Sequence, residues 1–426
     1  MMILKKVLFQ VITLALLSSI AITLIGPGIA QANPGWYNNN NDWQYRKKIT
    51  INSVSVTDNL TNFPVLISLA SDGSLDAYAQ DDGDDILFTA ADEVTKLSHE
   101  IESFNGTNGQ LVAWVKIPSL SAVTDTEIYM YYGNAVVSNQ EDTANVWDSN
   151  YKMVQHMEET SGGTDSITDS TINANHGTDN NTPTFGATGQ IDGSIDFDGS
   201  PTNNYLRVDH SSSLSITGDI TLEAWVNTDN NSLPYQTILE KRPGITEYNY
   251  YIRLDVGYFR YSFISGVSHK ALLDNTTQLS NNTWHYVVAT YDNSNIRLYV
   301  DGTEVKNSVE TAALEANTGD IYIGIETYGG FDKAFDGTID ETRISDAARS
   351  AEWIQTSYNN HNNPGAFITL GSETTPEAPV VVGGEIFPVD KPRVLAPWLV
   401  LLLMTSLVTI GGIFQFRKST EKSRFY

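Results

Sequence analysis

The sequence predicts an all-β protein built from two β-sandwich domains and followed by one C-terminal transmembrane helix. Three observations lead to this fold class. Apolar and polar residues alternate with a period of two along much of the chain, which is typical of strands and not of helices. Turn sequences rich in Asp, Asn and Gly separate the alternating segments. Residues 394–416 are free of charge and long enough to cross a hydrocarbon layer of roughly 30 Å.

The clearest strands lie in the stretch Trp284–Val305. Apolar residues occupy every second position on both sides of the turn Asp292–Asn295. Asp301-Gly302 follows, and it is a strong hairpin signal because the turn that it favours needs positive φ angles. This stretch therefore predicts an antiparallel meander of two strands and the start of a third.

The N-terminal residues 1–32 have the features of a secretory signal peptide. Lys5 and Lys6 precede an apolar run, and Ala30-Gln31-Ala32 offers the small residues of a cleavage site. An uncleaved N-terminal anchor is the alternative interpretation. The Asn-rich residues 33–42 are expected to form a flexible lead.

The C-terminal residues predict how the chain is anchored. Residues 417–426 carry four basic side chains directly after the apolar run, which places this tail in the cytoplasm and the rest of the chain outside. Residues 373–393 contain four prolines and a Gly pair and are expected to form a stalk. We therefore expect an exported, single-pass protein of the cell surface. A sorting signal, in which an enzyme replaces the apolar span by another anchor, is the alternative.

Composition excludes several classes of function. The chain has 25 Lys and Arg against 51 Asp and Glu, a net charge of −26, so its surface repels nucleic acid and anionic lipid headgroups. It has no cysteine, which excludes disulfides, thiol catalysis and thiolate metal sites.

Residues 43–138 are expected to form the first sandwich, and residues 139–146 a linker. Alternating strands are predicted at Lys48–Ile51, Phe63–Leu69, Asp85–Phe88, Leu111–Ile117 and Glu127–Tyr132. The acidic run that ends at Asp85 lacks the spacing of a calcium loop and predicts a hairpin loop.

Residues 147–372 are expected to form the second sandwich. Its first strand is predicted at Met153–Glu158 and its last at Phe367–Leu370, with a hairpin that turns at Val256-Gly257. One helix is predicted, Ser345–Tyr358, with Ser345 or Asp346 as its N-cap.

Four motifs in the second domain resemble the concanavalin-A-like, laminin-G-type jelly roll of microbial cell surfaces. They are GSIDFDGS at 193–200, ITLEAWVNT at 220–228, WHYVVATYDNSNIRLYVDG at 284–302 and FDGTIDETRIS at 335–345. Their order along the chain is that of the family. The resemblance implies a jelly roll that recognises a glycan or a surface protein.

The first domain resembles a prokaryotic domain-of-unknown-function family that is often found just ahead of laminin-G-like domains. Its motifs are W-x-Y-R-K at 43–47, F-P-V at 63–65, D-D-I-x-F at 84–88, K-L-x-x-E-I-E at 96–102, A-W-V-K-I-P at 113–118 and Y-Y-G-N at 131–134. The resemblance implies an extracellular accessory module and carries no known reaction.

The sequence offers no recognised catalytic motif, so we expect a protein that is not an enzyme. Glucanases of this fold need carboxylates at alternate positions of one strand, written E-x-D-x-x-E, and this string does not occur. Asp340 and Glu341 form the nearest acidic pair, but adjacent residues of a strand point to opposite faces. The string that begins at His99-Glu100 lacks the second histidine of a zinc protease motif.

Calcium is the cofactor that the sequence suggests, in a structural role. Hard cations prefer carboxylate and carbonyl oxygens, and the resemblance implies an ion held by an aspartate near a sheet edge. The candidate ligands are Asp169, Asp198 and Asp340. In the alternative interpretation these aspartates are turn residues that accept hydrogen bonds from their own backbone.

Taken together, the sequence predicts a membrane-anchored recognition or adhesion protein of the cell surface that binds carbohydrate or a surface partner. Aromatic residues such as Tyr248, Tyr251, Tyr258, Tyr261 and Trp225 can stack on sugars, but in a sandwich every second aromatic belongs to the core. Two alternatives stay open: a structural component of the cell envelope or surface layer, and an extracellular glycan-active enzyme.

Overall fold

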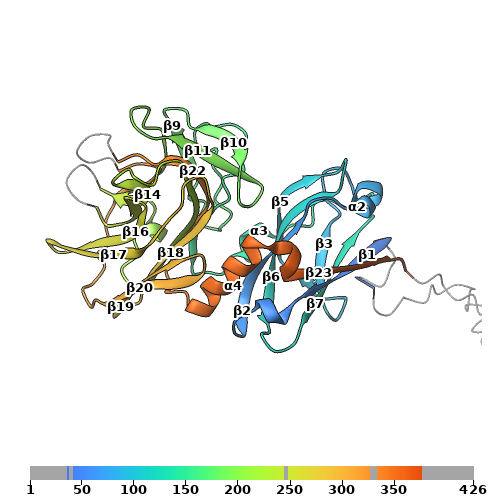
Figure 1. Ribbon diagram of the computed structural model, residues 1–426. Coiled ribbons are helices and arrows are strands. Elements are labelled where there is room, and N and C mark those ends of the chain that lie inside the picture. The colour runs from blue at the N-terminus through green and yellow to red at the C-terminus, as the bar shows by residue number, and fades with distance from the viewer. Residues whose placement is uncertain (1–35, 38–41, 244–247, 327–332, 377–426) are drawn as a thin grey trace, which may run out of the picture. The chain divides into compact units, whose positions relative to one another are not determined.

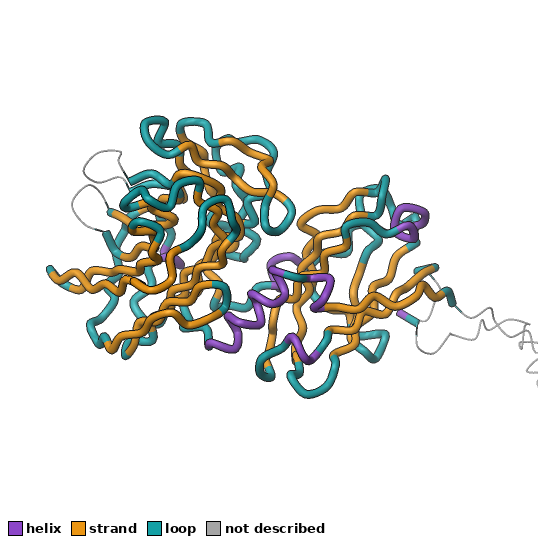
Figure 2. Tube along the Cα trace, viewed as in Figure 1, coloured by secondary structure: helices purple, strands orange, loops and turns teal. Residues whose placement is uncertain are grey.

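The computed structural model describes residues 36–37, 42–243, 248–326 and 333–376. The expected signal peptide, apolar span and basic tail lie outside these residues, as do most of the lead and of the stalk. Among the helices of the described ranges, none combines the length and the apolar character that a membrane crossing requires. Within these ranges the chain is all-β, as predicted, with short helices between long strands (Figure 2).

The first sandwich packs a five-stranded sheet, in the order β23-β1-β7-β3-β4, against a three-stranded sheet, β2-β6-β5 (Figure 1). Its strands are β1 Tyr45–Ile51, β2 Leu60–Leu69, β3 Leu87–Ala90, β4 Lys96–Leu97, β5 His99–Asn105, β6 Gln110–Leu120, β7 Thr126–Tyr132 and β23 Ile368–Thr374. Two short helices, α2 Gly73–Tyr78 and α3 Thr143–Val146, lie in its connections.

Strand β23 corrects the predicted domain boundary at residue 372. The sequence assigned the last strand to the second sandwich, but Ile368 lies opposite Ile51 of β1, in the first sandwich. The second sandwich is therefore inserted between β7 and β23. The alternation within Phe367–Leu370 shows which side chains are buried, but it does not show which sheet edge the strand joins.

The second sandwich packs two large sheets around one core. One sheet has the order β10-β11-β22-β13-β18-β19-β20, with β8 paired to β22, and the other has the order β17-β16-β15-β14-β21-β12-β9. The first contains β8 Tyr151–Gln155, β10 Thr184–Thr188, β11 Gly193–Asp198, β13 Ile220–Thr228, β18 His285–Tyr291, β19 Asn295–Val300, β20 Thr303–Val309 and β22 Asp336–Ser345. The second contains β9 Gly177–Asn180, β12 Tyr205–Val208, β14 Gln236–Arg242, β15 Tyr250–Asp255, β16 Tyr258–Ser265, β17 Ser268–Gln278 and β21 Asp320–Ile323.

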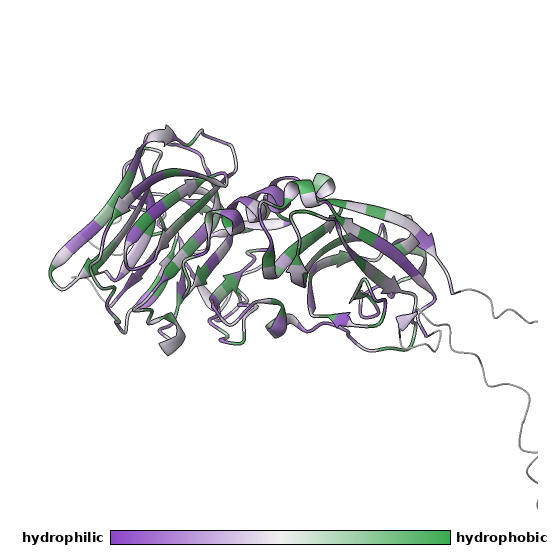
Figure 3. Ribbon diagram, turned by 90° about the horizontal axis from the view of Figure 1, so that it is seen from below, coloured by the Kyte–Doolittle hydropathy of each residue, from purple (hydrophilic) through white to green (hydrophobic). Residues whose placement is uncertain are grey.

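The predicted alternation and turns are confirmed in this sandwich. Hydrophobic and hydrophilic positions follow one another along its strands (Figure 3), and the meander of β18, β19 and β20 is formed by consecutive neighbours. Asp301 and Gly302 have φ angles of 51° and 77°, and Val256 and Gly257 have 54° and 76°. Both hairpins therefore use a turn with two positive φ angles, which Asp301-Gly302 favours and which is unusual for the β-branched Val256.

The principal helix begins later than predicted. Ser345 still belongs to β22, and α4 spans Ala351–Asn362 with Ser350 as its N-cap, whose side chain accepts a hydrogen bond from the backbone of Trp353 at 3.2 Å. Helix α5, Pro364–Phe367, then leads into β23. One face of α4 covers a cluster of buried aromatic residues on the outer face of the eight-stranded sheet, which includes Trp225 and Tyr286. The adjacent face, with Trp353, contributes to the core of the first sandwich.

Candidate functional site

Asp169 organises a loop through its own hydrogen bonds. Its carboxylate accepts backbone N–H groups from Val154 at 2.9 Å, Thr171 at 3.0 Å and Asn175 at 2.7 Å, and the Thr171 hydroxyl at 2.9 Å. Burial raises the pKa of this carboxyl, and the same backbone groups act against that rise. Because each oxygen already accepts two hydrogen bonds, the carboxylate holds the loop in its conformation.

Asp198 lies in an acidic corner at the end of β11. It pairs in register with Asp336 of β22 and accepts a hydrogen bond from the Asn204 side chain at 3.1 Å. Burial and the nearby charges of Asp229 and Asp198 raise the pKa of Asp336. These are oxygen ligands of the kind that calcium prefers, and calcium binding at this corner stays a prediction.

Asp340 lies neither in the loop of Asp169 nor in the acidic corner of Asp198. It is fully buried in β22, where its Oδ2 accepts the backbone N–H of Ile191 at 2.9 Å and its Oδ1 has no hydrogen-bond partner among the described residues. Burial, followed by the neighbouring carboxylate of Glu341, raises its pKa well above the usual range. The structure therefore does not join the three predicted aspartates into one ion site.

A β-bulge in β22 places Asp340 and its neighbours. Ile339 and Ile344 both point into the core. They are five positions apart, so in a regular strand they would point to opposite faces. The register against β13 shifts at this point, and Glu341 has a φ of 53°, which is uncommon outside glycine. Asp340 and Glu341 consequently lie in the same buried polar region, contrary to the expectation that adjacent strand residues point apart.

That region contains a cluster that we call the carboxylate–histidine cluster, formed by Glu100 and Glu102 of β5, His156 directly after β8, and Asp340 and Glu341 of β22. His156 Nδ1 lies 2.8 Å from Glu341 Oε1 and 3.4 Å from Glu102 Oε2, and its Nε2 lies 3.5 Å from Glu100 Oε2. Among the described residues, Glu102, His156 and Glu341 are the one group of three potential metal ligands whose ligand atoms lie within 4.8 Å of one another.

Aromatic rings and one arginine enclose this cluster. The rings of Trp114 and His156 are stacked with centroids 5.6 Å apart, and Trp147 lies at the same centroid distance from His156. The guanidinium of Arg343 lies 4.5 Å from the centroid of Trp114 and donates to Glu341 Oε2 from Nε at 3.1 Å. The cluster is therefore buried among aromatic rings and one guanidinium, where charges interact more strongly than in water.

The pKa values of the cluster follow from burial and from these neighbours. Burial lowers the pKa of His156, but the carboxylates of Glu341, Glu102 and Glu100 outweigh it and raise this pKa well above 6.5. Burial raises the pKa of Glu341, yet His156 and Arg343 lower it to about 2. The pKa of Glu102 is raised well above 4.5, first by burial.

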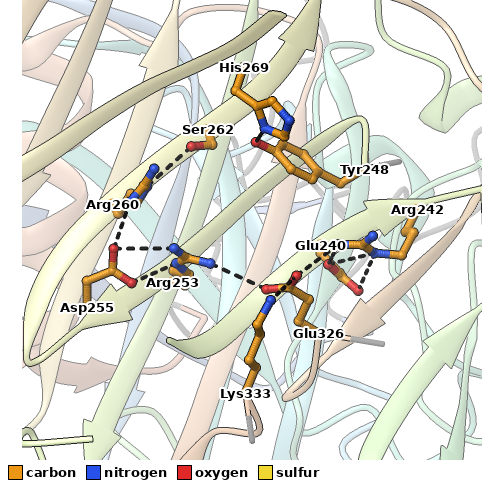
Figure 4. A network of polar contacts seen from close by, with 10 residues as sticks. All are labelled: Glu240, Arg242, Tyr248, Arg253, Asp255, Arg260, Ser262, His269, Glu326 and Lys333. Carbon is orange, nitrogen blue, oxygen red and sulfur yellow. Dashed lines mark hydrogen bonds and ion pairs between the residues drawn. The ribbon is translucent and has the colours of Figure 1, made fainter. Parts of the chain in front are cut away.

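A second polar array lies on the outer face of the seven-stranded sheet, opposite its core side (Figure 4). Glu326 is its centre: it contacts Arg242 at 3.1 Å, Arg253 at 3.3 Å and Lys333 at 2.6 Å. Asp255 continues the array, because it contacts Arg253 at 2.7 Å and Arg260 at 2.9 Å. Arg242, Arg253 and Glu326 are buried within this array, whereas Asp255 and Arg260 are half-buried. We call this side of the sheet the outer face.

Tyrosine rings border the outer face. Arg253 lies 4.6 Å from the ring centroid of Tyr235 and 4.8 Å from that of Tyr251, and Tyr248 packs edge-on against Tyr251 at 4.6 Å. Tyr235 keeps 44% of its surface exposed and Tyr258 is half-buried, whereas Tyr261 points into the core. This separates the tyrosines that can meet a ligand from those that stabilise the fold, which the sequence alone left open.

Comparison with known families agrees with both predicted resemblances. Residues 198–355 match the family model of the concanavalin A-like lectin/glucanases superfamily. Residues 82–170 match the model of a domain of unknown function, DUF2341. The predicted family resemblance is confirmed. The second sandwich is called the laminin-G-like sandwich below. A comparison with curated proteins finds no match.

Several solved structures are similar to part of the chain. The binding domain of Paraclostridial Mosquitocidal Protein 1 is 17% identical with a TM-score of 0.41, and the match covers 50% of this chain and 52% of that one. Domain 4 of AbnA, an extracellular arabinanase from Geobacillus stearothermophilus, was solved with arabinotriose and is 17% identical with a TM-score of 0.40. The match covers 49% of this chain and 98% of that one. The binding domain of botulinum neurotoxin serotype G is 14% identical with a TM-score of 0.39, and the match covers 49% of this chain and 50% of that one. The chain thus spans about half the length of the first of these.

Sequence reasoning missed the carboxylate–histidine cluster. The sequence pattern places Glu100 and Glu102 only in an incomplete zinc protease motif and in a family motif, and it assigns no role to His156. One signal was present: Glu100 and Glu102 lie two positions apart on a predicted strand, so both point to one face. Nothing local in the sequence indicated that His156 and Glu341 would meet that face.

Proposed function

We propose that the laminin-G-like sandwich is a recognition module that binds carbohydrate through its outer face. The observation that carries this proposal is the exposed ring of Tyr235, with 44% of its surface accessible, over a fixed array in which Arg242, Glu326 and Arg253 are 3–7% exposed. Rings offer stacking surfaces for sugars, and oriented donors and acceptors can bind hydroxyl groups. Membership of a superfamily named for lectins and glucanases supports the same proposal.

The other sheet offers less surface for a ligand. The side of the eight-stranded sheet that faces away from its core carries Trp225 and Tyr286, which are both 1% exposed beneath α4. The acidic pair Asp340 and Glu341, which comes nearest to a hydrolase arrangement, is buried as well. A sugar chain cannot reach these carboxylates without separating packed elements, so we propose binding and not hydrolysis as the function.

Binding of the full chain to a broad glycan array, first with calcium and then with a chelator, tests this proposal. We expect retention by a defined class of sugar. Tyr235→Ala should weaken that binding about tenfold or more, because one stacked ring contributes on the order of 1–2 kcal/mol. Tyr78→Ala is the matched control, since Tyr78 of α2 in the first sandwich is similarly exposed, at 46%.

A folded chain that binds no glycan in either condition would contradict carbohydrate recognition. Two readouts then separate the remaining classes. Self-association of the chain, measured by analytical ultracentrifugation, would favour a structural component of the cell envelope. Retention of a monomeric chain on intact cells, lost after protease treatment of those cells, would favour a surface protein as the partner.

We also propose that the protein is exported and held at the cell surface by residues 394–416. The apolar run, the basic residues after it and the predicted signal peptide support this proposal. Fractionation and protease shaving of intact cells test it: the chain should sediment with membranes and lose its folded domains to external protease. A chain found in the cytosolic fraction would contradict it.

A further inference from the structure

Three side chains from separate parts of the chain converge with the spacing of metal ligands. His156 Nδ1 lies 2.8 Å from Glu341 Oε1 and 3.4 Å from Glu102 Oε2. Ligand atoms that each bind one zinc ion at about 2.0–2.2 Å in tetrahedral geometry lie roughly 3.4 Å apart. The three groups therefore need only small adjustments to share one ion.

Two of these three side chains, Glu102 and Glu341, are held by a second hydrogen-bonding partner. Trp114 Nε1 donates to Glu102 Oε2 at 2.7 Å, and Arg343 Nε donates to Glu341 Oε2 at 3.1 Å. Outer partners of this kind orient ligands in protein metal sites and tune their affinity.

The other ring nitrogen of His156 lies within ion-pair distance of a carboxylate, although no hydrogen bond joins the two among the described residues. Its Nε2 faces Glu100 Oε2 at 3.5 Å, on the side of the ring away from the two ligand carboxylates. Glu100 is itself fixed by Trp147 Nε1 at 2.9 Å and by the Ser170 hydroxyl at 2.6 Å. With a metal on Nδ1, the Nε2 proton can be donated to Glu100, which gives a carboxylate–histidine–metal arrangement.

Two buried carboxylate oxygens at the cluster have no hydrogen-bond partner among the described residues. The Glu102 side chain is 0% exposed, yet its Oε1 accepts no hydrogen bond from the described residues, and neither does the neighbouring Asp340 Oδ1. Buried carboxylate oxygens in native proteins are normally hydrogen-bonded or bound to a cation.

We propose that Glu102, His156 and Glu341 bind a zinc ion between the two sandwiches. One imidazole nitrogen with two carboxylates suits zinc and similar first-row metals, whereas calcium takes oxygen ligands almost exclusively. Glu102 comes from the first sandwich, and His156 and Glu341 come from the second. The ion consequently links the two domains, and its role is structural. This site is separate from the outer face and does not depend on the function proposed for it.

Metal titration of the full chain tests the proposal. The chain is stripped with a chelator and titrated with zinc chloride by calorimetry, and bound zinc is counted after dialysis. We expect one zinc per chain and a higher unfolding temperature with zinc, since an ion that binds only the folded state stabilises it. Cobalt(II) in place of zinc should give visible absorption bands that report ligation by nitrogen and oxygen.

Glu102→Gln is the informative variant, because an amide keeps the shape of the side chain and can still accept from Trp114. We expect its zinc affinity to fall about 100-fold while its circular dichroism stays unchanged. The matched control is Glu93→Gln, which removes a partly buried carboxylate that pairs with Arg46 in the first sandwich. Its zinc affinity should equal that of the wild type.

Two results would overturn the proposal. One is a wild-type chain that binds no zinc in stoichiometric amount and gives no specific cobalt spectrum; the cluster is then a protonated histidine between carboxylates. The other is a Glu102→Gln chain that binds zinc as tightly as the wild type. The cobalt spectrum of the wild type decides the question even if the variant fails to fold.

Discussion

Ile368 lies opposite Ile51 on the neighbouring strand of the first sandwich, so residues near both ends of the described chain close one sheet. Both side chains are buried in the same core, together with Ile49. The laminin-G-like sandwich is thus held at both of its ends by the first domain. This explains why the connections on either side of it, α3 and α4, pack against strands of the first sandwich.

Replacing Ile368 by alanine should destabilise the first sandwich. Its side chain is 5% exposed, and removal of buried methyl groups of this size costs about 2–5 kcal/mol. Denaturant unfolding followed by tryptophan fluorescence measures the loss. Thr369→Ala is the control, because Thr369 is exposed on the same strand and its loss should change stability by less than about 0.5 kcal/mol. Equal effects of both variants would argue against burial as the cause.

Local sequence patterns were sufficient for much of the fold. Alternation located the strands and the Asp301-Gly302 turn located a hairpin, because both features depend on neighbouring residues only. The position of β23 depends on an edge that β1 offers from the other end of the chain. The site depends on a bulge at Glu341, a residue type that rarely adopts a positive φ angle. Neither the edge nor the bulge has a local sequence signal.

Helix α4 shows the same limit at its N-terminus. Ser345, Asp346 and Ser350 are all acceptable caps by residue type. Pairing of Ser345 with Thr221 in the sheet excludes Ser345, and of the other two it is the Ser350 side chain that accepts a backbone N–H of the helix.

Ser350→Ala should cost about 1 kcal/mol, since the Ser350 hydroxyl accepts the backbone N–H of Trp353 at the start of the helix. Asp346→Ala should cost less than about 0.5 kcal/mol, because Asp346 makes one partly exposed ion pair with Lys152. The loss of stability on thermal unfolding, measured for both variants, shows which of the two residues caps the helix. A larger loss for Asp346→Ala would mean that the helix begins where the sequence first suggested.

Gly302→Ala should destabilise the hairpin between β19 and β20 by about 1 kcal/mol or more. Gly302 has a φ of 77°, a conformation that alanine adopts only with strain. A Cβ there would also meet the Gln355 side chain at 2.7 Å and Tyr358 Cβ at 2.9 Å, both on α4. Gly266→Ala is the control for φ alone, since Gly266 has a φ of 59° and an added Cβ meets no atom within 4 Å. A loss that is larger for Gly302 assigns the difference to contact with α4.

His99 should make the first sandwich less stable in mild acid. Burial lowers the pKa of His99 to about 4, against about 6.5 in an unfolded chain, although the carbonyl oxygens of Leu97 and Ile86 act against this. Between these values only the unfolded chain takes up the proton, so stability is present above pH 6.5 and falls as pH drops toward 4, by up to about 3 kcal/mol. His99→Gln should flatten the plot of unfolding free energy against pH in this window, whereas His269→Gln, at an exposed histidine, should leave its slope unchanged. An unchanged slope in His99→Gln would show that other groups take up the protons.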